Sequence, residues 1–292
     1  MRSPLAHKSH LQIAHSPDAD DIFMYYALYF GWVGDDFKLT NKALDIEALN
    51  KAALQLRYEA SAISFALYPK ICNDYALLRT AHSFGNGYGP KLIKKRGKKL
   101  KRNCKVALSG ENTTNAMIFK LFYKDARIYY MNFLDIEGAV LRGEVDAGIL
   151  IHESILHFSS DLEVEAEIWD IWRDLAGDLP LPLGGMAILR SIPLLRALRL
   201  EEELKRAITV AWSAPKIFSE MLFERNLIRV NESELKTYLG LYADKSSIWL
   251  NPLQKSGINK LFELGFDGGF YTSKLDCEDY FIPSDYASLR YS

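Results

Sequence analysis

One histidine and one carboxylate follow an apolar run near the middle of the chain. Residues 146–153 read Asp-Ala-Gly-Ile-Leu-Ile-His-Glu, and small and β-branched residues with little alternation predict a strand covered on both faces. His152 and Glu153 come where that strand must leave its sheet, which is the edge where open α/β sheets bind ligands. His152 is therefore a candidate for acid–base chemistry. The competing interpretation is a histidine that caps a helix or satisfies a buried carbonyl.

A second group of titratable residues lies near the start of the chain. Residues 16–21 read Ser-Pro-Asp-Ala-Asp-Asp, between the short strand predicted at 11–15 and the amphipathic helix predicted at 22–30. Aspartates at a helix start accept hydrogen bonds from its free N–H groups, so at least one of Asp18, Asp20 and Asp21 is expected to be a cap. Capping one helix does not require three acidic side chains. One of them is expected to face a cleft.

A turn rich in hydroxyl groups follows the strand predicted at 106–108. Residues 109–114 read Ser-Gly-Glu-Asn-Thr-Thr and lead into a helix predicted over 115–123. Gly110, Thr113 and Thr114 at such a turn offer backbone N–H and hydroxyl groups, which suit a carboxylate or a phosphate. The competing interpretation is that Thr113 or Thr114 only caps the helix. Both roles can coexist at one turn.

Two helix–strand units of similar sequence must position these side chains. Residues 45–62 and 135–147 both begin with Asp-Ile-Glu and leave with Leu-Arg-x-Glu-x-x-Ala. Matched order of this kind predicts an α/β protein of two lobes of similar build. Ser64 would then leave the first strand near the place where His152 leaves the second.

Three further segments connect these units. Residues 81–90 hold three glycines and are predicted to be an irregular hinge or ligand contact. Basic residues 94–102 are predicted to form a solvated loop. Residues 179–185, rich in proline and glycine, are predicted to cross between lobes before a strand at 186–189. From Ile192 onward the periodicity is mainly helical.

Composition limits the classes of partner. The 292 residues include 36 basic and 37 acidic side chains, for a formal charge of −1, which removes the electrostatic case for nucleic acid and leaves a small neutral or anionic ligand. No run of about 18 apolar residues could span a membrane, and residues 1–10 lack a signal-peptide core. Three widely spaced cysteines support neither a zinc site nor disulfides, so a cytoplasmic chain with reduced thiols is expected.

In order, several motifs resemble the 1,4-dihydroxy-6-naphthoate synthase family of the futalosine route to menaquinone. They lie between about residues 11 and 190, at 16–21, 61–64, 85–90, 110–114, 151–153 and 179–185. The resemblance implies a two-lobed fold like the type II periplasmic binding proteins, with a ligand cleft between the lobes. It also implies a carbon–carbon lyase that converts cyclic dehypoxanthinyl futalosine to 1,4-dihydroxy-6-naphthoate. His152 would be its general base, and no metal or organic cofactor would be needed.

The resemblance also implies residue roles and boundaries. Ser64 and Thr113 or Thr114, with Gly110, would bind the substrate, most plausibly through its carboxylate. Many relatives have Ser-Pro-Cys-Pro-Asn-Asp at residues 16–21, and an extra acid would repel an anion, so Asp18 is left out of the binding set. Asp20, Asp21 and Glu153 stay unassigned. Lobe one would comprise residues 1–90 and 190–292, and lobe two residues 91–189.

Two other functions stay open at this point. Chorismate dehydratase of the same pathway would share the fold, although the resemblance places the histidine of 151–153 only in the naphthoate synthase. A small-anion binding protein without catalysis would also fit the fold. Monomer and homodimer are both open.

Overall fold

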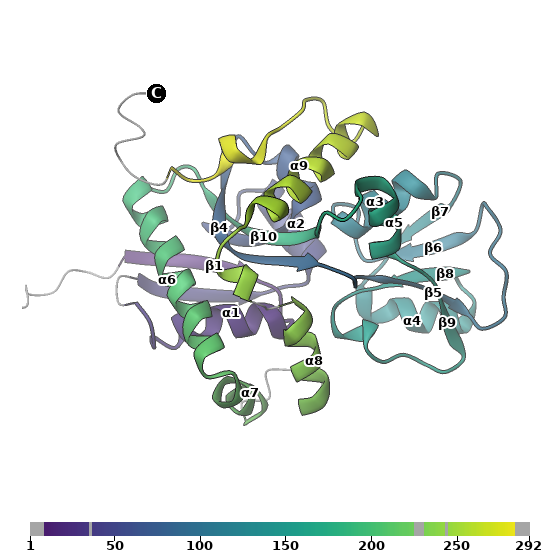
Figure 1. Cartoon of the computed structure of the whole chain (residues 1–292), viewed down its shortest axis with the longest axis horizontal. Helices are drawn as coiled ribbons and strands as arrows, with labels where there is room; N and C mark the ends of the chain where they lie inside the picture. The colour runs from purple at the N-terminus through teal and green to yellow at the C-terminus, as the bar shows by residue number, and fades with distance from the viewer. Residues whose placement is uncertain (1–8, 35–36, 225–230, 243–244, 284–292) are drawn as a thin grey trace, which may run out of the picture.

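Two five-stranded sheets organise the molecule and lie at its two ends (Figure 1). The structure, a computed structural model, describes residues 9–34, 37–224, 231–242 and 245–283. The first sheet has the order β2-β1-β3-β10-β4, with β1 parallel to β2 and β3 and with β10 antiparallel to β3 and β4. Its strands are β1 (Ser9–His15), β2 (Phe37–Ala43), β3 (Ala60–Ser64), β4 (Tyr75–Gly85) and β10 (Leu181–Leu189).

The second sheet is built by the middle of the chain. Its order is β7-β6-β8-β5-β9, and its strands are β5 (Lys91–Lys95), β6 (Lys105–Leu108), β7 (Arg127–Tyr130), β8 (Ala147–Leu150) and β9 (Leu162–Glu167). The chain thus leaves the first sheet after β4, completes the second sheet and returns as β10. Because β10 pairs with β3 and β4, residues 181–189 belong to the first sheet. The lobe boundaries at 90 and 189 remain a prediction.

Helices cover the faces of both sheets. Near the first sheet, α6 packs against α1 and β4, while α3 and α5 lie side by side between the two sheets (Figure 1). The α-helices are α1 (Ala19–Tyr29), α2 (Ile46–Leu54), α3 (Thr114–Phe122), α4 (Phe133–Arg142), α5 (Ile168–Ala176), α6 (Leu194–Ser213), α7 (Pro215–Glu224), α8 (Glu232–Tyr242) and α9 (Pro252–Asp267). Short 3₁₀ turns are η1 (Phe65–Lys70), η2 (His152–Ile155), η3 (Lys245–Ile248) and η4 (Cys277–Tyr280).

The buried strand before His152 is confirmed as β8. All four of its residues are buried, and Gly148 is required there because a Cβ atom would lie 2.4 Å from Cγ2 of Ile136 on α4. The absence of a side chain therefore lets α4 pack directly on the strand. This packing fixes where β8 ends and where the chain turns into η2.

The two similar helix–strand units differ at their helix starts. Asp45 is the N-cap of α2 and accepts hydrogen bonds from the backbone N–H groups of residues 47 and 48. The matching Asp135 lies inside α4, whose N-cap is Asn132. In each unit the helix packs on the strand that follows it, α2 on β3 and α4 on β8. The two units therefore share the way the helix packs on the strand. They differ in where the Asp-Ile-Glu motif lies relative to the start of the helix.

The predicted irregular segments at 81–90 and 179–185 are partly wrong. Residues 81–85 belong to β4, and β10 begins at Leu181. Both glycines of β10 have a packing role, because a Cβ atom at Gly184 would lie 2.8 Å from the Ile63 carbonyl oxygen and one at Gly185 would lie 2.9 Å from Phe65. The glycines allow close strand packing instead of breaking the strand. A register shift between β4 and β10 accompanies the positive φ of +61° at Ala81.

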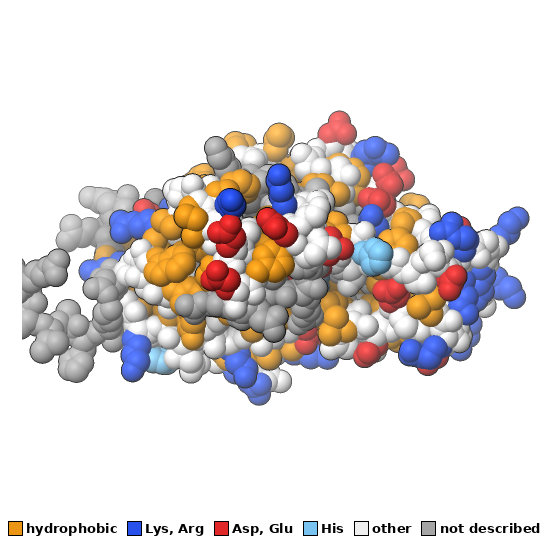
Figure 2. Space-filling view, turned by 90° about the horizontal axis from the view of Figure 1, so that it is seen from below, with side chains coloured by type: hydrophobic (Ala, Val, Ile, Leu, Met, Phe, Trp, Pro, Cys, Tyr) orange, Lys and Arg blue, Asp and Glu red, His pale blue; other side chains and the backbone are white. Residues whose placement is uncertain are grey.

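The basic segment 94–102 lies at the far end of the second sheet. Figure 2 shows Lys and Arg side chains gathered at that end of the molecule. Lys94 forms ion pairs with Glu163 and Glu165, and Lys98 pairs with Asp146. Most residues between 96 and 103 are exposed, as predicted for a solvated loop. Among the helices of the described ranges, none is both long and apolar enough to cross a membrane.

Candidate active site

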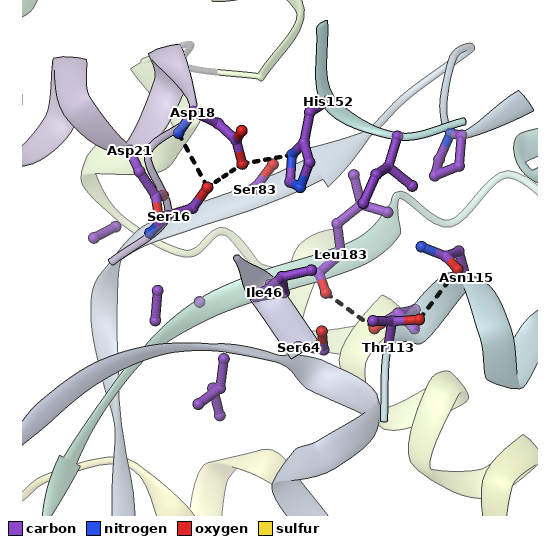
Figure 3. A pocket seen from close by; sticks show the side chains of 18 of the residues that line it. Ser16, Asp18, Asp21, Ile46, Ser64, Ser83, Thr113, Asn115, His152 and Leu183 are labelled. Carbon is purple, nitrogen blue, oxygen red and sulfur yellow. Dashed lines mark hydrogen bonds and ion pairs between the residues drawn. The ribbon is translucent and has the colours of Figure 1, made fainter. Parts of the chain in front are cut away.

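A cavity lies between the two sheets. Its walls come from the turn before α1, from β3, β4 and β10 of the first sheet, and from the start of α3 and the end of β8. Four residues predicted from the sequence line it together: Ser64, Thr113, Thr114 and His152. Figure 3 shows His152 and Thr113 at separate places around it.

His152 pairs with Asp18 across the cavity. The Nδ1 atom of His152 lies 2.7 Å from Oδ2 of Asp18 (Figure 3). The Asp18 side chain is only 2% exposed, whereas that of His152 is 17% exposed. The carboxylate is thus almost fully removed from water, and the imidazole keeps access to the cavity. A buried carboxylate next to an imidazole orients the ring and stabilises its protonated form.

The backbone places His152 at a sharp exit from β8. His152 has φ of +55°, in the left-handed region that non-glycine residues rarely occupy. Such strain persists where surrounding contacts fix it, and it is concentrated at functional sites. Phe133 packs edge-on against the imidazole at 5.0 Å between ring centroids. Strand end, strained residue and aromatic contact together direct the ring into the cavity.

Asp18 occupies the N-cap position of α1, but its side chain makes no capping hydrogen bond. Instead, its Oδ2 atom also accepts from the Ser16 hydroxyl, and its backbone N–H donates to Ser16 Oγ at 3.1 Å. Asp21 Oδ2 accepts from the backbone N–H of Ser16 at 2.7 Å. Of Asp18 and Asp21, whose side chains the structure describes, Asp18 has its carboxylate against His152. The side chain of Asp20 lies outside what the structure describes.

Glu153 binds the start of α1. Its Oε1 atom accepts from the backbone N–H of Ala19 at 3.1 Å, although the two residues are 134 positions apart. Burial raises the pKa of the Glu153 carboxyl, and the negative charge of Asp18 raises it further. Glu153 thus caps a helix of the opposite wall. The sequence analysis left Glu153 without an assigned role.

On the first sheet, Ser64 lines the cavity at the end of β3. Asn50 on α2 holds it from behind, because Asn50 Nδ2 donates to Ser64 Oγ at 3.0 Å and Asn50 Oδ1 accepts from the Ser64 backbone N–H at 2.9 Å. Since the hydroxyl oxygen already accepts from Asn50, its proton is available to a ligand in the cavity. Ser64 is therefore placed to donate.

The two threonines of α3 have different partners. Thr113 caps α3, where its Oγ1 accepts from the backbone N–H of Ala116 at 3.4 Å. Thr114 Oγ1 donates to the Leu183 carbonyl at 2.9 Å and accepts from the Ala66 N–H at 3.2 Å. Its hydroxyl therefore links α3 to β10 and η1 of the first sheet. The structure leaves the backbone N–H groups at the start of α3 as the donors that these residues could offer to a ligand.

Gly110 lies behind this wall. A Cβ atom there would meet Glu47 Oε2 at 2.3 Å, and its carbonyl oxygen lies 3.1 Å from Thr113 Oγ1. Glu47 accepts in turn from the backbone and side-chain nitrogens of Asn112. Within the part of the chain that the structure describes, Gly110 is not among the residues lining the cavity. Direct substrate contact by Gly110 stays a prediction.

Sequence reasoning did not single out Asn115, which lines the cavity one residue after the threonines. Thr113 Oγ1 lies 3.1 Å from Asn115 Oδ1, so the amide nitrogen points to the other side, toward Leu183 (Figure 3). Asn115 was treated as an ordinary helix residue. Its place in the first turn, beside the threonines already chosen, was the signal that could have identified it.

Metal ligation is not suggested by the side chains of this site. Among the residues that the structure describes, no group of three or more His, Cys, Asp or Glu side chains is arranged to hold an ion. The arrangement offers a paired imidazole at one end of the cavity and neutral hydrogen-bond donors at the other. Such a site can bind a polar ligand and move a proton.

The two sheets and the cavity between them define a protein with the two-lobed fold of the periplasmic binding proteins. The periplasmic aliphatic sulphonate binding protein of Escherichia coli has this fold, with a TM-score of 0.64, 10% identity and coverage of 94% of this chain and 92% of that one. A crystal structure of a protein from Archaeoglobus fulgidus is more similar, with a TM-score of 0.84, 31% identity and coverage of 90% and 99%. The predicted fold class is confirmed.

The chain belongs to the menaquinone biosynthesis family, whose sequence profile matches residues 11–267. Two relatives are named 1,4-dihydroxy-6-naphthoate synthase. The protein from Streptomyces coelicolor is 29% identical over 242 residues, 80% of this chain and 85% of that one. The protein from Thermus thermophilus is 30% identical over 208 residues, 70% and 76% of the two chains. The family predicted from the motifs is confirmed.

Proposed function

We propose that the chain is a carbon–carbon lyase that converts cyclic dehypoxanthinyl futalosine to 1,4-dihydroxy-6-naphthoate in menaquinone biosynthesis. Membership of the menaquinone biosynthesis family and the two synthase relatives support this reaction. The observation that carries it is the pairing of His152 with Asp18, 2.7 Å apart, at the edge of a cavity lined by polar side chains. A paired imidazole facing such a cavity is suited to general base catalysis.

In this proposal His152 removes a proton from carbon. A carbon-bound proton next to a carbonyl is acidic enough for an imidazole whose ordinary pKa is about 6.5. Loss of the sugar-derived fragment then allows the ring to become aromatic, which supplies much of the driving force. A positioned base of this kind contributes about 10²- to 10⁴-fold to the rate.

The end of the cavity formed by the start of α3 and the end of β3 would bind the substrate carboxylate. The start of α3, with its free backbone N–H groups, favours a negative charge. Ser64 and Asn115 lie on the same side of the cavity and offer neutral donors. The Asp18 carboxylate accepts hydrogen bonds from the imidazole and the Ser16 hydroxyl, which stabilise its charge beside His152.

The test is turnover of cyclic dehypoxanthinyl futalosine by the native chain and by His152→Asn. Asparagine tolerates the left-handed backbone of this position, so the variant removes the base without new strain. Release of dihydroxynaphthoate by the native chain, with a loss of at least about 10²-fold in the variant, is expected. Binding of the substrate without any product would contradict the proposal and favour a binding protein. Formation of product from chorismate would favour the dehydratase.

A further inference from the structure

The two nitrogens of His152 cannot both act as the base. In a neutral imidazole one nitrogen carries hydrogen and the other has the free lone pair. The carboxylate of Asp18, 2.7 Å from Nδ1, accepts a hydrogen bond and so places the hydrogen on Nδ1. The lone pair is then on Nε2. A ring without this partner could exchange its hydrogen between the two positions.

Asp18 is itself fixed by hydrogen bonds with its near neighbours in the sequence. The Ser16 hydroxyl donates to the same carboxylate oxygen that contacts His152, and the Asp18 backbone N–H donates to Ser16 Oγ. Asp21 holds the backbone N–H of Ser16 from the first turn of α1. With its side chain 2% exposed, Asp18 has little freedom to turn away. Rigid support of this kind is what a precisely oriented catalytic group needs.

The remaining charged groups around the imidazole come from two elements. From the α1 side, Asp18 and Asp21 face the cavity, and on η2 the Glu153 carboxylate is directed to the N–H of Ala19. Phe133, on α4, covers the ring with an apolar edge. Asp18 is the carboxylate for which the structure gives a direct contact with the ring.

We propose, on the basis of the function proposed above, that Asp18 is a positioning residue that holds His152 in the Nδ1–H tautomer, so that Nε2 is the base. Asp18 lies on the first sheet's side of the cavity and His152 at the end of β8 in the second sheet. The base is therefore set by a residue from the opposite wall. The pair exists only at the separation of the walls seen here, so opening of the cleft would release the base from its orientation.

The nitrogen-15 NMR spectrum of the histidine side chains tests the tautomer directly in the full chain. His152→Asn identifies the signals of His152 among the six histidines. The native spectrum is expected to show hydrogen on Nδ1, and Asp18→Asn is expected to shift His152 toward the other tautomer or a mixture. A native His152 with its hydrogen on Nε2 would overturn the proposal without any variant being needed.

Kinetics of the same variants give a second readout. Asp18→Asn is expected to lower kcat by about 10²-fold or more with KM changed less than about threefold, since wrong-tautomer variants of paired histidines lose this much or more. The acid limb of the kcat profile should move to lower pH, because the anion that favours the imidazolium is gone. Asp18→Glu should recover part of kcat. Asp276→Asn, which removes a helix-capping carboxylate far from the cavity, is the matched control.

The two proposals can fail separately. If the native chain makes no dihydroxynaphthoate, the reaction is wrong, and the NMR spectra still decide whether Asp18 sets the tautomer. If the native chain is active but Asp18→Asn keeps the native kcat, pH profile and spectrum, Asp18 is not a positioning residue. A merely structural role for Asp18 would lower stability and leave the pH limb in place.

Discussion

Two histidines, His82 on β4 of the first sheet and His152 just after β8 of the second, have opposite surroundings. His152 contacts a carboxylate and faces a cavity. His82, on β4, is fully buried, donates from Nε2 to the Leu78 carbonyl at 3.0 Å and lies between Phe65 and Phe84. Burial lowers the pKa of His82 to about 4. His82 is thus a histidine that satisfies a buried carbonyl.

The comparison shows what separates a functional histidine from a structural one. Burial alone removes the charge and leaves a neutral ring that packs like an aromatic residue. A carboxylate partner with access to a cavity does the reverse, because it orients the ring and permits proton uptake. Both residues lie on or beside buried strands. What distinguishes them is the group that each ring contacts, a carboxylate for His152 and a backbone carbonyl for His82.

Exchanging each histidine for asparagine should separate the two roles most strongly. His152→Asn is expected to lower kcat by about 10²- to 10⁴-fold, with a nearly unchanged free energy of unfolding. His82→Asn should lose about 2–4 kcal/mol of stability, in the range for shortening a buried aromatic side chain, while the folded fraction keeps most of its kcat. Paired turnover assays and urea unfolding curves measure both. Equal loss of kcat in the two variants would remove the distinction.

His82 should also make folding sensitive to acid. Its pKa is about 4 in the folded chain and about 6.5 when unfolded, so below pH 6.5 the unfolded chain binds a proton that the folded chain does not. Stability is therefore full above about pH 6.5 and falls by about 3 kcal/mol as the pH drops to 4. The measurement is urea unfolding of the native chain and of His82→Gln at pH 7 and pH 4.5.

Since glutamine does not titrate, other acid-sensitive groups cancel in the difference between these two proteins. The native chain should lose about 2–3 kcal/mol more than His82→Gln between the two pH values. An equal loss in both would mean that His82 can be protonated in the folded state.

The strand that presents His152 could be predicted from the sequence, but its partner could not. Four consecutive buried positions identify β8, and the end of such a strand is a place where ligands bind. Asp18 precedes His152 by more than a hundred residues, and its location at a helix start fits a cap equally well. Which carboxylate meets the imidazole depends on how the two sheets are placed, and no local pattern contains that information.

The glycine-rich segments were predicted only in part, for a related reason. Glycine near proline usually indicates a turn, whereas Gly184 and Gly185 lie inside β10 because neighbouring atoms leave no room for a Cβ atom. Close packing from η1 and β3 is a tertiary property. The local pattern alone could not separate a glycine needed for flexibility from one needed for space.

The contrast between cavity-facing and core-facing residues extends to two serines on β3. Ser64 lines the cavity, while Ser61 is fully buried and donates to the Ala62 carbonyl. Ser64→Ala is expected to raise KM about tenfold with kcat little changed, since a hydrogen bond to a charged group contributes about 1.5 kcal/mol or more. Ser61→Ala is the matched control and should leave KM unchanged. A fall in kcat in Ser64→Ala would instead place this serine in the chemical step.

The smallest expected effects in this comparison come from two asparagines. Asn50 is fully buried and holds Ser64 through two hydrogen bonds, whereas Asn115 directs its amide nitrogen toward the cavity from the first turn of α3. Asn115→Ala should raise KM about threefold at constant kcat, since one neutral hydrogen bond contributes about 1 kcal/mol or less. Alanine is the better helix former, so the fold should not weaken.

Asn50→Ala should behave in the opposite way. It leaves the Ser64 backbone N–H unsatisfied in the core, which costs about 1–3 kcal/mol of stability, and it raises KM only through the loss of support for Ser64. Steady-state kinetics and urea unfolding of both variants provide the comparison. Suppose instead that Asn115→Ala lowers kcat more than it raises KM. The residues at the start of α3 would then take part in the chemistry, and the assignment of proton transfer to His152 alone would be wrong.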